Sequence, residues 1–166
     1  MKLKMPTFSD LKMNIKSLLC KFMPKTYKEW KTRFESKFLC NLKSWMYKND
    51  INFKLIPKYY EILFYWSFIN FQREEQIINS LKERNFNVKR SNIKLDAIFK
   101  VDLIVAKDGF RYFLQIKNQA INLTEEEHKQ LINFSNKRNY TPILVYKSKN
   151  NYIFINLLSN KEIFLV

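Results

Sequence analysis

Residues 98–117 constrain the fold of this chain more than any other part of its sequence. They hold two apolar runs, 98–106 and 110–117, separated by Lys107-Asp108-Gly109. Asp-Gly between two such runs is a strong β-hairpin signal, because glycine supplies the positive φ that a tight turn requires. Gly109 is the only glycine in the sequence, which excludes the glycine-rich phosphate loops of P-loop and dinucleotide-binding proteins.

Helical and strand-like patterns surround this hairpin. Apolar residues at helical spacing predict helices over 11–22, 27–47 and, from Pro57, 57–84. A Thr124-x-x-Glu127 capping box begins another helix that ends near 139. Further short strands are expected at 86–88, 143–146 and 152–157.

The order of these elements, α-β-β-β-α-β-β, predicts an α/β (α+β) fold with a mixed β-sheet flanked by helices. The expected division is a basic helical extension at 1–55 and one domain at 56–166. Along 27–47, a stripe of large apolar residues is interpreted as core packing rather than as a platform for stacking bases. The stripe consists of Trp30, Phe34, Phe38, Leu42 and Trp45.

The charge balance indicates a polyanionic partner. Lys and Arg number 30 against 15 Asp and Glu, a net charge of +15. Such a field attracts nucleic acid, while an anionic membrane surface and a lysine-rich coding bias are the competing interpretations. The residues expected to contact phosphates are Lys25, Lys28, Lys31, Arg33, Lys37 and Lys43.

Cysteine and histidine are too scarce for a structural zinc site. The chain has two cysteines and one histidine, whereas such a site takes about four Cys or His ligands. Cys20 and Cys40 are interpreted as reduced core residues of a cytoplasmic protein. Met1-Lys2-Leu3-Lys4 gives no secretory signal, and the most apolar stretch, 59–71, is too short and too polar to span a bilayer.

Four residues form the candidate active site. Gln115 and Lys117 lie two apart on one predicted strand, so both project from the same face, and the hairpin brings Asp102 close to them. Glu74 is expected on or beside the buried face of the long helix. Its neighbour Glu75 is expected further from that face and is the less favoured candidate for the site. A carboxylate, an amide oxygen and a nearby acid suit Mg²⁺ or Mn²⁺, while a lysine can position water and neutralise phosphate charge.

These residues resemble the PD-(D/E)XK nuclease superfamily, which includes restriction-endonuclease-like, Holliday-junction-resolvase-like and small homing endonucleases. The resemblance covers about 66–157 and rests on Glu74, Val101-Asp102 and Gln115-Ile116-Lys117. Val101 stands in place of the family's proline. Gln115 replaces an acidic residue, which lowers the negative charge of the site by one.

The resemblance implies a Mg²⁺- or Mn²⁺-dependent DNA endonuclease that leaves 5′-phosphate ends. Asp102, Gln115, the Ile116 carbonyl and Glu74 would hold the metal, and Lys117 the attacking water. A homodimer is expected from the same resemblance. The alternatives are a catalytically inactive nuclease fold that binds DNA or RNA, and a peripheral protein whose basic helices lie on membrane.

Overall fold

The structure, a computed structural model, describes residues 2–92, 95, 98–117 and 125–165. Its contacts divide the chain into two compact units, Met1–Arg73 and Glu74–Val166. This division lies beyond the expected boundary at 55/56. The reason is that aromatic residues after Pro57, including Tyr59 and Phe64, are buried in the core of the N-terminal unit.

The N-terminal unit is helical and has an aromatic core. Trp30 stacks on Phe64 with ring centroids 4.9 Å apart, and its indole N–H donates to the Phe64 carbonyl at 3.3 Å. Phe38 and Leu42 are fully buried beside them, so the interpretation of the aromatic stripe as core packing is confirmed. The elements are α1 (Ile15–Phe22), α2 (Tyr27–Lys48), η1 (Phe53–Leu55), α3 (Ile56–Tyr60), η2 (Glu61–Tyr65) and α4 (Trp66–Glu83), which continues into the second unit.

Two helix boundaries differ from the sequence prediction. The first helix begins at Ile15 rather than at residue 11, because Asp10 holds a turn by accepting from the Thr7 N–H at 2.8 Å. The Asn14 side chain then caps the helix. The long helix expected from Pro57 is present, but η2 inserts one π-helical segment between α3 and α4.

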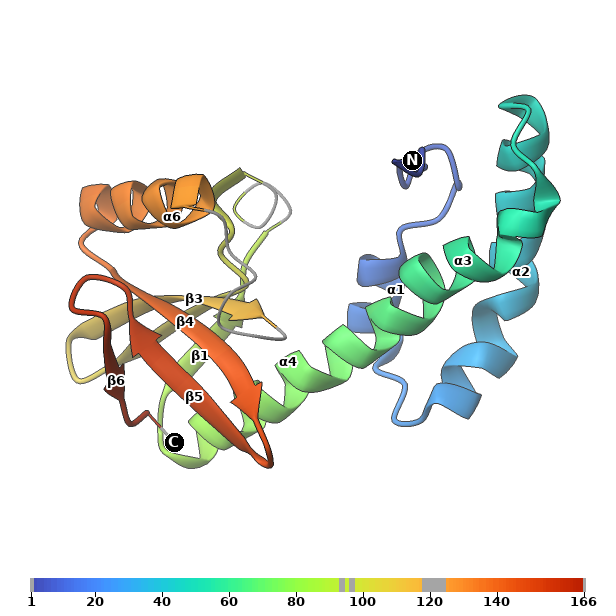
Figure 1. The fold of residues 1–166 in the computed structure, drawn as a ribbon. Coiled ribbons are helices and arrows are strands. Elements are labelled where there is room, and N and C mark those ends of the chain that lie inside the picture. The colour runs from blue at the N-terminus through green and yellow to red at the C-terminus, as the bar shows by residue number, and fades with distance from the viewer. Residues whose placement is uncertain (1, 93–94, 96–97, 118–124, 166) are drawn as a thin grey trace. The chain divides into compact units, whose positions relative to one another are not determined.

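The C-terminal unit is a six-stranded mixed sheet flanked by helices (Figure 1). Among the described residues the strands lie in chain order, and only β3 and β4 pair in parallel, joined through helix α6 (Glu125–Arg138). The predicted fold class is confirmed. The structure adds one edge strand, β6, after the last strand that the sequence predicted. The strands are β1 (Asn87–Arg90), β2 (Leu103–Lys107), β3 (Phe110–Lys117), β4 (Thr141–Ser148), β5 (Asn151–Asn156) and β6 (Lys161–Ile163).

The predicted hairpin joins β2 and β3. Lys107 pairs with Phe110, and the two turn residues Asp108 and Gly109 have φ of 52° and 82°, as a tight two-residue turn requires. The strand prediction for 98–102 was wrong: residues 98 and 99 are helical, and β2 begins only at Leu103. The first strand likewise occupies 87–90 rather than 86–88. The helix expected from Thr124 is confirmed as α6, but Thr124 itself lies outside the described residues.

Helices cover both faces of this sheet. Ile77 and Leu81 of α4 pack in one buried cluster with Leu114 of β3. Phe134 of α6 packs in another with Phe113. Side chains alternate along a strand, so even-numbered β3 residues face α4 and odd-numbered ones face α6.

Both cysteines are free thiols. Cys20 is half-buried and Cys40 is exposed, so the core interpretation was wrong for Cys40, which lies on the outer side of α2. Within the described residues, no helix is both long and apolar enough to cross a membrane.

Candidate active site

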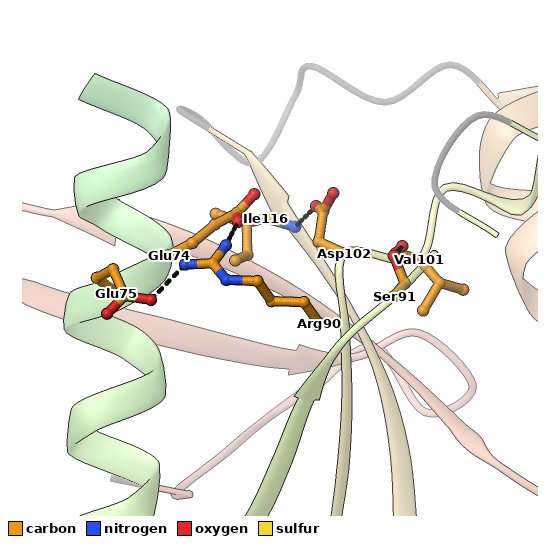
Figure 2. Close-up of polar contacts among 7 residues, drawn as sticks. All are labelled: Glu74, Glu75, Arg90, Ser91, Val101, Asp102 and Ile116. Atoms are coloured by element: carbon orange, nitrogen blue, oxygen red, sulfur yellow. Dashed lines mark hydrogen bonds and ion pairs between the residues drawn. The ribbon is translucent and has the colours of Figure 1, made fainter. Parts of the chain in front are cut away.

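Asp102 is fixed to both neighbouring strands. It lies just before β2, is 9% exposed, and accepts from the Ile116 N–H through Oδ2 at 2.7 Å (Figure 2). Its own N–H donates to the Leu114 carbonyl at 2.8 Å, and its carbonyl accepts from the Ser91 N–H at 3.0 Å. The hairpin therefore brings Asp102 to the Gln115-Ile116-Lys117 segment, as the sequence predicted.

Gln115 carries a buried acceptor that lacks a partner. The residue is 4% exposed, and among the described residues its Oε1 has no hydrogen-bond donor. It lies beside Leu144 of β4 on the face covered by α6. A buried amide oxygen without a partner is destabilising by about 1–3 kcal/mol. A hard cation, which prefers oxygen ligands, would remove that cost, so the donor chemistry at Gln115 fits a divalent metal.

Lys117 follows Gln115 at the end of β3. The strand is regular there, with Gln115 and Lys117 opposite Leu144 and Tyr146 of β4, so both project from the same face. Lys117 is half-buried. The predicted pairing of an amide and an ammonium group on one face is present.

Glu74 is held by an arginine that the sequence had not singled out. Arg90, at the end of β1, forms ion pairs with both Glu74 and Glu75 of α4 (Figure 2). All three side chains are largely buried. Arg90 lies opposite Leu103, whose side chain faces α4. The signal was available: once β1 extends to 90, alternation from Val88 places Arg90 on the inner face.

The Glu74–Arg90 ion pair and the side chains of Gln115 and Lys117 therefore lie on different faces of the sheet. The Glu74–Arg90 pair lies on the α4 side, whereas Gln115 and Lys117 lie on the α6 side. Asp102 immediately precedes β2, and in the sequence it comes after Arg90 and before Gln115. In the described part of the chain, no three His, Cys, Asp and Glu side chains gather closely enough to hold a metal. A metal here would need the Gln115 amide oxygen.

His128 presents a second buried polar atom. It lies on α6, and within the described residues its Nε2 has no hydrogen-bond partner. Leu131, one turn further along the helix, is fully buried, so His128 shares the side of α6 that faces the sheet. The spacing of three residues to Leu131 already indicates this side of the helix in the sequence.

The lysines and arginine assigned to phosphate contacts are all exposed. The N-terminal unit carries 15 Lys and Arg against 5 Asp and Glu in residues 1–73. Lys31 pairs with Glu35 at 3.8 Å, and the Arg33 guanidinium lies over the Phe22 ring at 4.3 Å. The exposed set is Lys25, Lys28, Lys31, Arg33, Lys37 and Lys43.

Comparison with known proteins finds similar chains among solved structures only. No family model matches the chain, and no curated protein matches it. Among solved structures it is similar to Hjc, a Holliday junction resolvase from Archaeoglobus fulgidus, with a TM-score of 0.46 and 13% identity. The match covers 52% of this chain and 75% of that chain.

Proposed function

We propose that this chain is a metal-dependent DNA endonuclease whose active site lies at the ends of β2 and β3. The observation that carries the proposal is the buried Oε1 of Gln115, which has no partner among the described residues, one position before Ile116, whose N–H binds the Asp102 carboxylate. A folded protein retains such an acceptor at a cost in stability, and sites that do so are characteristically functional.

The residues have distinct roles in the proposed site. Asp102, Gln115 and the Ile116 carbonyl would hold Mg²⁺ or Mn²⁺. The cation, when bound, supplies Lewis-acid activation of the scissile phosphate and of water. Lys117 orients the attacking water and offsets charge that develops on the phosphate. Glu74 would have to join this ligand set from the α4 side of the sheet, where Arg90 binds its carboxylate.

The exposed cations of the N-terminal unit would bind the phosphate backbone of the DNA. If six phosphates are contacted, affinity for duplex DNA falls with about the fifth power of salt concentration. Fluorescence anisotropy of a labelled duplex, titrated at several salt concentrations, measures this slope. A slope near zero would remove the nucleic-acid part of the proposal.

Cleavage of plasmid and branched DNA tests the proposed site. Wild type, Asp102→Ala and Lys117→Ala are compared in Mg²⁺ or Mn²⁺, with Lys89→Ala as a matched control. Lys89 is an exposed lysine of the same sheet, on β1. Wild type and the control should cleave, and the two site variants should not. Equal activity in all four proteins would refute the assignment.

A binding protein with a nuclease-like fold and no catalysis is the second candidate. It is favoured by the ion pair that occupies Glu74 and by glutamine in place of an acid at 115. It predicts that wild type binds DNA or RNA without cleaving it, and that Lys117→Ala binds equally well. A homodimer with two sites related by two-fold symmetry is proposed only for the endonuclease, because it would cut both strands.

A further inference from the structure

Four aromatic rings form a nearly parallel stack between α6 and the sheet. Phe99 stacks on Phe134 at 3.9 Å between centroids with an interplanar angle of 13°. Phe134 stacks on Phe113 at 5.3 Å and 14°, and Phe113 on Tyr140 at 3.9 Å and 1°. Phe99 and Tyr140 are the two ends of this stack.

Local structure brings these rings together from separate elements. Phe113 lies on β3, and its odd number places it on the face covered by α6. Asn139 ends α6 in the left-handed conformation, with φ of 59°, and the Tyr140 N–H donates back to the Ser135 carbonyl at 2.9 Å. This helix end turns the chain so that Tyr140 lies on Phe113.

The stack lines a pocket of about 640 Å³ whose only described ionic groups are cationic. That volume is within the range of small-ligand sites, roughly 300–1,000 Å³. Arg111 and Arg138 line it and are exposed, and their guanidinium groups lie over the Tyr140 ring at 5.2 Å and the Phe134 ring at 5.4 Å. Among the described residues that line the pocket there is no Asp or Glu.

A second hollow adjoins this pocket at the Phe99 end of the stack. It has a volume of about 410 Å³ and shares Phe99, Phe134 and Arg138 with the first. Open space therefore borders the ring that ends the stack. A planar group placed against Phe99 would extend four parallel rings to five, and the Arg138 guanidinium lines the same hollow, where it could bind an attached phosphate.

We propose that the two adjoining hollows bind one unpaired nucleotide of a DNA strand, with the base stacked on Phe99 and a phosphate bound by Arg138, which lines both hollows beside that ring. A base in a duplex is stacked between its neighbours and cannot enter, so the pocket selects single-stranded or branched DNA. The inference rests on the DNA-binding part of the proposed function and is independent of cleavage.

A short DNA strand with one central 2-aminopurine provides the test, in EDTA so that no cleavage occurs. The emission of 2-aminopurine falls when the base stacks on an aromatic ring. Wild-type protein should quench the single strand and bind it more tightly than the matching duplex. Base–aromatic stacking predicts that Phe99→Ala weakens binding roughly tenfold or more and restores emission. Phe99→Tyr, which keeps the ring, should behave as wild type.

Arg138→Ala and Arg84→Ala form a matched pair, since each removes one exposed arginine of the C-terminal unit. Arg138→Ala should weaken binding and lower the salt slope by about one, whereas Arg84→Ala should leave the slope of the single-strand complex unchanged. If Phe99→Ala fails to fold by thermal denaturation, this pair decides the question.

Unquenched emission in the wild-type complex, equal binding of single strand and duplex, or wild-type affinity in folded Arg138→Ala would each overturn the inference. Quenching without any metal-dependent cleavage would support the nucleotide pocket and refute the endonuclease proposal. Metal-dependent cleavage without quenching would support the endonuclease proposal and refute the nucleotide pocket.

Discussion

Replacing Gln115 by methionine separates the structural cost of this side chain from its proposed role in metal binding. Gln115 is 4% exposed, and Oε1 has no described partner. Methionine has nearly the same length and shape but no amide. Because an unsatisfied buried acceptor costs about 1–3 kcal/mol, Gln115→Met should be more stable than wild type by about 1 kcal/mol or more without metal. For a unit of this size, that gain raises the midpoint of thermal unfolding by about 4–8 °C per kcal/mol.

Urea and thermal denaturation in EDTA, followed by far-ultraviolet circular dichroism, measure this gain. Tryptophan fluorescence is unsuitable because Trp30, Trp45 and Trp66 all lie in the N-terminal unit. The C-terminal transition is identified as the one that the substitution moves. A methionine variant that unfolds more easily than wild type in EDTA would refute the reasoning about the orphaned oxygen.

Added Mn²⁺ then tests the ligand role. A metal at one hundred times its dissociation constant stabilises the folded protein by about 2.7 kcal/mol. Wild type should gain stability with Mn²⁺, Gln115→Met should gain much less, and Gln115→Glu, which adds a carboxylate, should gain more. Equal gains in wild type and the methionine variant would show that Gln115 is not a ligand.

Three further predictions concern other contacts. Asp102→Asn keeps an acceptor for the β3 amide, so it should unfold near wild type yet fail to cleave DNA, whereas Asp102→Ala should lose about 1.5–3 kcal/mol in the same denaturation assay. Glu74→Gln and Glu75→Gln each weaken one ion pair to the shared arginine and should destabilise the fold similarly, but only the first should slow cleavage; equal slowing would remove Glu74 from the site. Burial, with hydrogen bonds to a glutamate and a second tyrosine, raises the pKa of Tyr60 above its usual value near 10. Its stabilising contribution is therefore complete below pH 10 and is lost as pH rises beyond it. Above pH 10 the stability of wild type should therefore fall more steeply with pH than that of Tyr60→Phe, and parallel stability curves for the two proteins would contradict this.

Local sequence signals determined the parts of this protein that depend on neighbours in the chain. Asp108-Gly109 specified the β2–β3 turn, because both residues adopt positive φ there. Alternation along β3 placed Gln115 and Lys117 on one face, and helical spacing placed Trp30 and its stripe in a core. These features follow from backbone periods of 2 and 3.6 residues, which a single segment expresses alone.

Contacts between distant segments were decided only by the tertiary structure. Helical spacing put Glu74 near a buried face, but nothing in its own segment identified Arg90 as its partner. The extension of β1, the late start of β2 at Leu103 and the stack from Phe99 to Tyr140 likewise depend on which elements pack together. The burial of an individual atom is also decided only by the tertiary structure. A strand pattern shows which way Gln115 points, whereas only the packing of α6 over the sheet decides that its oxygen is buried without a donor among the described residues.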